Sequence, residues 1–259
     1  MSFREIIYYT SLIEFKLRNS YMLVYAIIPA RSGSKGLPDK NIKEINGLPL
    51  ISYAINFAHE LEGVNRVFCS TDSTEYAVIA EKYGAEVPFL RSDYASRDDA
   101  MEQDILEDLR VKFRLNDIAE PDIIVWLRPT FVFRSKIDIE NAIFELKENK
   151  NLSAVRTVIE AENRLYNIND KYLVANFDDM NKSMMRRQDM PKSYKVFSTD
   201  IFRFKNKEIH EDFLGRNILA IESNKICGLD IDDIVDFHVV KSLVEHSQDL
   251  VNEYLPTNC

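Results

Sequence analysis

Short apolar runs alternate with longer segments of helical periodicity along most of this chain. The apolar runs, which we interpret as strands, are residues 23–28, 66–70, 86–88, 123–127, 153–158 and 195–204. The segments with helical periodicity are residues 49–61, 74–83, 101–113, 136–149 and 234–246. Such alternation is typical of βαβ units around a mainly parallel sheet. The sequence therefore predicts a three-layer, Rossmann-like α/β fold.

Composition limits the kinds of partner that the chain can have. With 259 residues, 46% of them hydrophobic, it can bury a full core, and we expect residues 22–259 to form a single domain. The net charge of −9 argues against nucleic acid or an anionic membrane as the main partner. Three cysteines, an odd number without metal-ligand spacing, predict neither a disulfide framework nor a zinc site. This cysteine usage fits a reducing cytoplasm.

Residues 1–21 differ from the rest of the chain. They mix apolar and charged residues, and they are too charged for a membrane span and lack the apolar core of a signal peptide. Two interpretations stay open for this segment. It is either an amphipathic N-terminal extension or the product of a start codon upstream of a true start at Met22.

Residues 26–41 are the most informative part of the sequence, because an apolar strand runs there into a loop rich in glycine, serine and cations. Gly33 and Gly36 let the backbone turn and approach a ligand closely, so that main-chain N–H groups can face an anion. The cations available to neutralise that anion are Arg31, Lys35 and Lys40. The loop follows the carboxyl end of a strand, where open α/β sheets bind ligands. This composition predicts a polyphosphate-binding loop.

The common phosphate motifs do not describe this loop. A P-loop requires Lys and Ser or Thr after its last glycine, whereas Gly36 is followed by Leu37 and Pro38. A dinucleotide fingerprint requires three glycines that lead directly into a helix, and Pro38 interrupts this loop. The plainer alternative is a basic loop exposed to solvent.

A pair of carboxylates, Asp230 and Asp232, forms the second candidate site. In an extended segment, residues i and i+2 face the same side, so both carboxylates are expected to point together. Such oxygen ligands suit Mg²⁺, which takes one or two protein carboxylates and completes its shell with phosphate and water. Asp232 also precedes a predicted helix and could serve as its N-cap. The residues alone leave both roles open.

Local patterns give three further expectations. Asp72 precedes a helical segment, and we expect it to be the N-cap, with Glu75 completing a capping box. Asn46-Gly47 is expected to form a tight turn. Pro49 suits the first turn of the helix that follows.

Several segments, in this order and with this spacing, resemble the acylneuraminate cytidylyltransferase family, the CMP-sialic acid synthetases and their CMP-nonulosonate relatives. The segments that carry the resemblance are residues 26–41, 42–50, 70–73, 83–91, 128–130, 186–191 and 229–232. The resemblance implies transfer of CMP from CTP to the anomeric hydroxyl of a sialic acid-like keto-sugar acid, with release of pyrophosphate and dependence on Mg²⁺. It also implies a cytoplasmic homodimer whose residues 159–193 project from the core toward the partner and its sugar site.

The resemblance assigns roles to individual residues. Those expected to act in catalysis are Arg31, Lys40 and Asp230. Those expected to bind the nucleotide are Arg31, Ser32, Gly33, Ser34, Lys35, Gly36, Asn41 and Arg128. Arg187 and Phe197 are expected at the sugar site, and Asp230 and Asp232 at the Mg²⁺ site.

Three departures from the family pattern concern substrate recognition. Arg128 stands where the family has a glutamine that reads the base, and arginine only donates hydrogen bonds. Phe197-Ser198 replaces an Asn-Gly pair beside the sugar, and residues 98–101 lack a serine that contacts the nucleotide. Two alternatives therefore stay open: a nucleotidyltransferase for another base or acidic sugar, and a paralogue that binds nucleotide or sugar without turnover.

Overall fold

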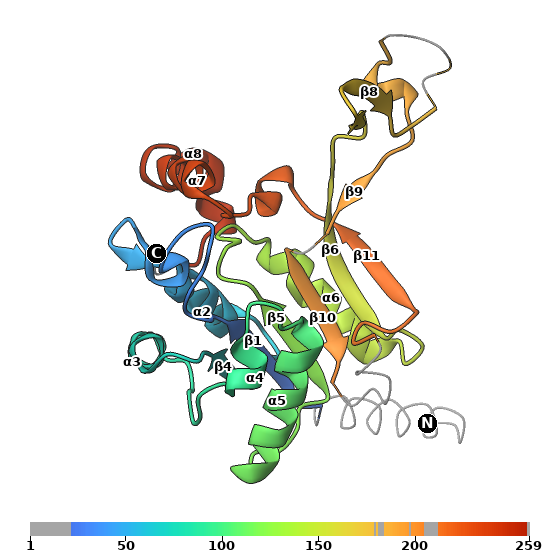
Figure 1. Cartoon of the computed structure of the whole chain (residues 1–259). Helices are drawn as coiled ribbons and strands as arrows, with labels where there is room; N and C mark the ends of the chain where they lie inside the picture. Colours follow the sequence, from blue (N-terminus) through green and yellow to red (C-terminus); the bar gives the residue numbers. More distant parts are fainter. Residues whose placement is uncertain (1–21, 179, 181–183, 197, 205–211, 258–259) are drawn as a thin grey trace, which may run out of the picture.

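The computed structural model describes residues 22–178, 180, 184–196, 198–204 and 212–257 (Figure 1). Its main sheet has the strand order β11-β6-β10-β5-β1-β4. These strands are β1 Val24–Pro29, β4 Arg66–Ser70, β5 Ile123–Leu127, β6 Ala154–Glu160, β10 Thr199–Arg203 and β11 Ile218–Glu222. β1 is parallel to β4 and β5, and β11 is parallel to β6, whereas β10 runs antiparallel between β5 and β6. The predicted mostly parallel sheet is confirmed.

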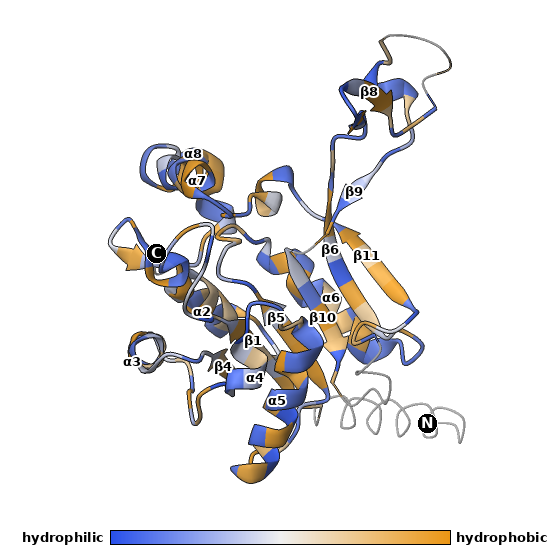
Figure 2. Cartoon of the chain, viewed as in Figure 1, coloured by the Kyte–Doolittle hydropathy of each residue, from blue (hydrophilic) through white to orange (hydrophobic). Residues whose placement is uncertain are grey.

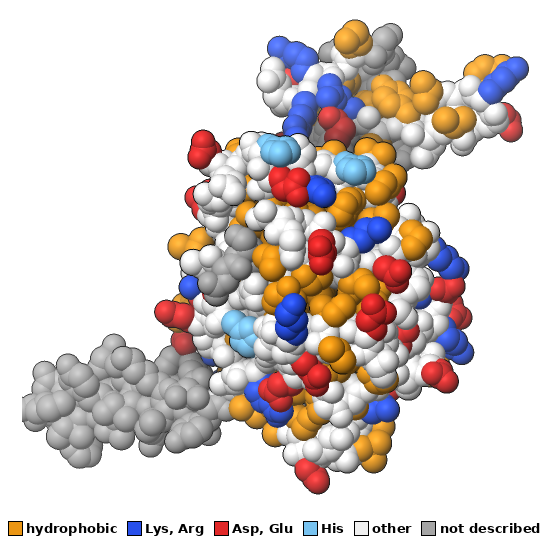
Figure 3. All heavy atoms as spheres, turned by 90° about the vertical axis from the view of Figure 1, so that its left-hand side faces the viewer, with side chains coloured by type: hydrophobic (Ala, Val, Ile, Leu, Met, Phe, Trp, Pro, Cys, Tyr) orange, Lys and Arg blue, Asp and Glu red, His pale blue; other side chains and the backbone are white. Residues whose placement is uncertain are grey.

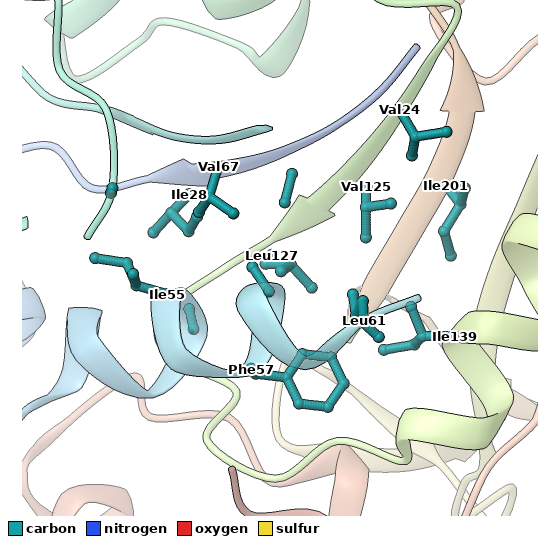
Figure 4. Close-up of a cluster of buried hydrophobic side chains, with 14 of the residues drawn as sticks. Val24, Ile28, Ile55, Phe57, Leu61, Val67, Val125, Leu127, Ile139 and Ile201 are labelled. Carbon is teal, nitrogen blue, oxygen red and sulfur yellow. The ribbon is translucent and has the colours of Figure 1, made fainter. Parts of the chain in front are cut away.

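Helices cover both faces of this sheet. The helices are α2 Leu50–Glu60, α3 Thr74–Lys82, α4 Asp93–Ser96, α5 Glu102–Leu115, α6 Lys136–Glu148, α7 Ile234–His246 and α8 Gln248–Val251. Alternate residues of β1 point to opposite faces, as strand geometry requires. Val24 and Ile28 pack with α2 and α6, whereas Tyr25 and Ile27 pack with α5. Figure 4 shows side chains of the buried cluster that contains Val24 and Ile28. In Figure 2 helix α5 carries both hydrophobic and hydrophilic residues. The three-layer α/β architecture is confirmed.

The buried cluster on the opposite face of the sheet, which contains Tyr25 and Ile27, is centred on an aromatic ring of α5. Phe113 is fully buried, and its ring centroid lies 5.2 Å from that of Phe68 and 5.8 Å from that of Phe89. Tyr25 and Phe204 approach the same ring edge-on, at 6.0 and 6.3 Å. Phe113 therefore joins α5 to strands β1 and β4, which carry Tyr25 and Phe68.

Most predicted elements agree with the structure, and three do not. Residues 195–204 form two strands, β9 Tyr194–Lys195 and β10, instead of one. Residues 86–88 contribute only an isolated bridge between Glu86 and Phe68. Pro49 is the last residue of β3 and occupies the N-cap position of α2, just before its first turn.

The predicted Asn46-Gly47 turn is confirmed. It joins β2 Glu44–Ile45 to β3 Leu48–Pro49 in a small antiparallel hairpin. Both turn residues have positive φ, 51° for Asn46 and 75° for Gly47, which is the conformation that a two-residue hairpin turn needs.

A second hairpin projects from the body of the molecule (Figures 1 and 3). It consists of β7 Tyr166–Asn169 and β8 Tyr172–Ala175, and β6 and β9 pair at its base. Large apolar side chains on it are exposed, among them Ile168 at 74% and Leu173 at 71%. Within the described ranges, no helix combines the length and the apolar character that crossing a bilayer requires.

We expect Phe113→Ala to lower the free energy of unfolding by about 3–5 kcal/mol, because it removes the ring at the centre of the aromatic cluster. Urea denaturation measures the change. Phe144→Ala is the matched control, since Phe144 is 59% exposed on α6, and it should leave stability nearly unchanged. Equal losses in the two variants would contradict the packing described for α5.

Candidate active site

The loop that follows β1 is fixed at its start by Asp72. One carboxylate oxygen of Asp72 accepts a hydrogen bond from the Ser32 backbone N–H at 2.7 Å, and the other accepts from Ser32 Oγ at 2.7 Å. The predicted helix-capping role of Asp72 is therefore wrong, and Ser73 caps α3 by accepting from the Tyr76 N–H. Gly33, the next residue, turns with φ of 70°. Asp72 thus holds the loop in place from the neighbouring strand end.

Two of the loop cations share one carboxylate. Arg31 Nη1 lies 2.8 Å from Asp98 Oδ1, and Lys35 Nζ lies 2.6 Å from Asp98 Oδ2. Hydrogen bonds from Lys35 and then Arg31 hold the pKa of Asp98 below its usual value. Asp98 itself is half-exposed, in the segment between α4 and α5. The two cations therefore gather around an anionic group.

The third cation, Lys40, joins the loop to the carboxylate pair. Lys40 Nζ donates to the Ile231 carbonyl at 2.6 Å and lies 3.7 Å from Asp232 Oδ1. Gly36 packs against the same segment, because a Cβ atom added there would lie 2.5 Å from the Asp232 carbonyl oxygen. The structure thus brings together two sites that are almost 200 residues apart in the sequence.

The segment that carries the two aspartates belongs to no strand of the sheet. It lies between a 3₁₀ helix, η3 Lys225–Gly228, and α7, and the Ile231 N–H donates to the Thr130 carbonyl at 3.1 Å. Asp233 is the N-cap of α7, since its carboxylate accepts from the two N–H groups of residues 235 and 236. The capping alternative for Asp232 is therefore wrong.

Asp230 and Asp232 have different surroundings. Asp230 is largely buried, and its Oδ1 atom has no hydrogen-bond partner within the described part of the chain. Burial raises the pKa of Asp230, and the charge of Asp232 adds to this, while Thr130, Lys195 and Lys40 act in the opposite direction. The Asp232 side chain is 78% exposed. An unpartnered buried carboxylate oxygen is costly unless another group binds it.

A divalent cation fits these two carboxylates by the chemistry of the donor atoms. No cluster of three or more potential metal ligands occurs among the residues that the structure describes. Mg²⁺ does not need one, because it commonly binds one or two carboxylates and takes its other ligands from phosphate and water. The Oδ1 atom of Asp230, which has no hydrogen-bond partner among the described residues, is the ligand atom that such an ion would bind.

A cavity of about 220 Å³ lies beside the loop, and three of the predicted nucleotide residues line it: Arg31, Asn41 and Arg128. Asn41 is buried at its edge, and its side-chain amide donates to the Arg31 carbonyl at 3.0 Å. Ser32, Gly33, Ser34, Lys35 and Gly36 belong to the adjoining loop. The side chains that line the cavity are those of Pro29, Arg31, Lys40, Asn41, Arg91, Ala95, Arg97, Ala100, Glu102, Ile105, Trp126, Arg128, Pro129 and Thr130.

Arg128 lines this cavity but is held by acidic residues. Its guanidinium donates to Glu102 Oε1 through Nε at 2.9 Å and to Asp200 Oδ2 through Nη2 at 2.9 Å. Trp126 Nε1 donates to the same Glu102 oxygen at 3.0 Å, and Arg156 Nε donates to Asp200 at 2.6 Å. Arg128 is thus part of a network in which two carboxylates balance two guanidinium groups. This argues against a role as a free cation for phosphate.

The sequence does not identify Glu102 and Arg91 as site residues, although both line the cavity. Glu102 begins α5 and was read only as part of a helix. Arg91 is buried and donates to the Ser70 carbonyl at 2.7 Å, and burial lowers its pKa to about 10. Arg91 ends one of the segments that carry the family resemblance, which was an available signal; Glu102 had none.

A second cavity, of about 290 Å³, lies at the base of the projecting hairpin and contains Arg187. Arg187 Nη2 forms an ion pair with Glu160 Oε1 at 2.9 Å and is absent from the lining of the first cavity. Phe197, the other predicted sugar-site residue, lies outside the described residues. The lining of this cavity comprises Ile159, Glu160, Ala161, Glu162, Arg187, Lys195, Lys225, Gly228 and Leu229.

Comparisons with known proteins agree on one family. The cytidylyltransferase family model matches residues 25–220. The chain is 32% identical to pseudaminic acid cytidylyltransferase of Campylobacter jejuni over 84% of this chain and 94% of that protein. It is 31% identical to N-acylneuraminate cytidylyltransferase of Escherichia coli over 83% of this chain and 51% of that longer protein.

A solved structure supports the fold independently. The structure of CMP:2-keto-3-deoxy-manno-octonic acid synthetase with CTP superposes with a TM-score of 0.62 at 15% identity, over 87% of this chain and 99% of that one. At this identity the likeness concerns the fold alone. The family model and the relatives show that the chain belongs to the cytidylyltransferase family, the nucleotidyltransferases that include the acylneuraminate and pseudaminic acid enzymes.

Proposed function

We propose that this protein transfers CMP from CTP to the anomeric hydroxyl of a nonulosonic acid and releases pyrophosphate. The observation that carries the proposal is the docking of the cationic loop on the Asp230–Asp232 segment, through Lys40 and Gly36. This arrangement offers a polyphosphate both cations and a carboxylate pair that suits Mg²⁺. The names of the relatives supply the acceptor class.

In the proposed reaction, the anomeric oxygen attacks the α-phosphorus in line. A new P–O bond forms, the bond from the α-phosphorus to the bridging oxygen breaks, and pyrophosphate leaves with the electron pair while the hydroxyl proton passes to solvent. Arg31, Lys35 and Lys40 would stabilise the charge that develops on the phosphates. The first cavity, lined by Lys40 and Thr130, and the second, lined by Gly228 and Leu229 just before Asp230, would hold the reactants close enough to react.

Asp230 and Asp232 would hold the Mg²⁺ ion of the proposed function. When bound, the ion supplies positive charge to the phosphate oxygens. The buried, unpartnered oxygen of Asp230 supports this assignment.

Arg128 and Glu102 stand together at the cavity, where they bear on the choice between cytosine and another base. Arg128 only donates, whereas the Glu102 carboxylate accepts. A donor and an acceptor side by side match the edge of cytosine, which carries an amino group beside ring acceptors. This pairing favours CTP over UTP, because the carboxylate would repel the O4 atom of uracil.

We further propose that the protein is a cytoplasmic homodimer joined through the projecting hairpin. The exposed apolar side chains of β7 and β8 support this, since a monomer rarely leaves such a patch uncovered. The free thiols of Cys69 and Cys227 are buried, an arrangement that suits a reducing compartment.

The first test is pyrophosphate release with Mg²⁺, each nucleoside triphosphate in turn, and a panel of sialic, legionaminic, pseudaminic and Kdo-type acids. We expect release with CTP, and we expect Asp230→Asn to slow it by about 10²–10³-fold. Asp233→Asn is the matched control, because asparagine caps a helix as well as aspartate does. Release with another triphosphate would identify a different base, and no release with any pair would indicate a binding paralogue.

Asp98→Asn should strengthen CTP binding, measured calorimetrically without acceptor, by about three- to tenfold. The reason is that Asp98 competes with the triphosphate for Arg31 and Lys35. Asp99→Asn changes the same charge one residue away, where the carboxylate pairs with Arg97 instead, and should have a smaller effect. Weaker binding in Asp98→Asn would mean that Asp98 positions these cations for the ligand.

Leu173→Glu on the hairpin should convert the dimer into a monomer in sedimentation velocity, because it places a charge in the proposed apolar interface. Leu115→Glu serves as the control, since Leu115 is 73% exposed at the end of α5 and Leu173 is 71% exposed. A dimer that survives Leu173→Glu would refute association through the hairpin.

A further inference from the structure

In the second cavity, the acidic residues form ion pairs, whereas the two lysines form none with any residue that the structure describes. Of its acidic residues, Glu160 accepts from Arg187 at 2.9 Å and from Lys192 at 3.0 Å. Glu162 pairs with Arg164 at 2.8 Å. Both carboxylates therefore have cationic partners, and neither needs a further cation from the cavity lining.

Arg187 is committed to the cavity wall. Besides its ion pair with Glu160, its Nη2 atom donates to the Ala161 carbonyl at 3.4 Å. These contacts tie the 3₁₀ helix of residues 187–189 to the end of β6. An anion that enters the cavity would have to compete with Glu160 for this guanidinium.

Lys195 and Lys225 are the other two cations of the lining. In the described part of the chain, neither forms a salt bridge with a carboxylate. They leave the cavity with positive charge, although the whole protein carries a net charge of −9. A small anion is the ligand that such a local excess favours.

Lys195 also reaches the proposed reaction centre. It ends β9, paired with Ile159 of β6, and its Nζ atom donates to the Gly228 carbonyl at 3.2 Å. The same atom lies 5.7 Å from the centroid of the Phe131 ring. Gly228 stands two residues before Asp230 in the chain. An ammonium group has three donors, so the bond to Gly228 leaves capacity for a ligand.

We propose that Lys195, together with Lys225 of the same cavity lining, binds the carboxylate of the acidic sugar in this cavity. The inference rests on the proposed function and refines it, because it assigns acceptor recognition to Lys195 in place of Arg187. Ile159 and Leu229 supply apolar wall for the rest of the sugar. A carboxylate anchored at Lys195 holds the acceptor beside Asp230 and orients its anomeric hydroxyl, which in an α-keto acid sugar is on the carbon next to the carboxylate.

The test compares Lys195→Met with Lys192→Met. Lys192 also pairs with Glu160, but Lys192 itself does not line the cavity. In the presence of CMP and Mg²⁺, calorimetry measures binding of sialic, pseudaminic and legionaminic acids and of their methyl esters. We expect Lys195→Met to weaken binding of the cognate acid by about tenfold or more, since it removes a charge-assisted hydrogen bond. Lys192→Met should change it by less than about threefold, as an exposed ion pair would.

The ester provides a second readout that a structural defect would not reproduce. Esterification should weaken binding to the wild type about as much as Lys195→Met does, and it should have little further effect on that variant. Binding of CTP to Lys195→Met should stay within about twofold of wild type, which shows that the fold is intact.

Several results would overturn the proposal. These are equal binding by Lys195→Met and wild type, a loss in Arg187→Met without one in Lys195→Met, and no binding of any acid to the wild type. Acid binding that depends on Lys195, without pyrophosphate release, would instead support this site and refute the proposed transfer reaction.

Discussion

The contact between the cationic loop and the Asp230–Asp232 segment is the interaction on which the site depends. Lys40 donates to the Ile231 carbonyl, and Gly36 allows the two backbones to touch. Without this contact, the loop at the end of β1 and the aspartates before α7 would be separate surface features. With it, their opposite charges lie within one site. The mainly parallel sheet makes the contact possible, because it brings its strand ends to one edge.

Carboxylates set the charge of this site as much as cations do. Asp98 pairs with both Arg31 and Lys35, and Glu102 and Asp200 hold Arg128. Most of these cations therefore already have a carboxylate partner, and a triphosphate that binds here would compete with internal anions for them. Asp230 is the exception, because its buried oxygen has no partner in the described chain. A cation that binds this oxygen would offset the cost of burying it without a partner.

The sequence identified what is local and missed what depends on distant partners. The β4, β5 and α7 boundaries were predicted exactly, because their apolar patterns are continuous and their ends carry clear signals. β11 was missed because it is an edge strand whose residues alternate between exposed and partly buried. The loop and the two aspartates were found as motifs, since each is a short string. Asp72 and Asp98 act on partners 40 and 67 residues away, and no local pattern announces such contacts.

The base of the projecting hairpin has a consequence for how assembly relates to ligand affinity. The strands β6 and β9 carry the hairpin outward, and their paired residues Ile159 and Lys195 also line the second cavity. A partner that holds the hairpin and a sugar that fills the cavity would therefore act on the same two strands. Any difference in sugar affinity between monomer and dimer must appear as a difference in dimer affinity between empty and filled protein, and a dimer that binds two sugars sums the differences of its two sites. Protein concentration and sugar concentration would then both shift the same coupled equilibrium between monomer and dimer.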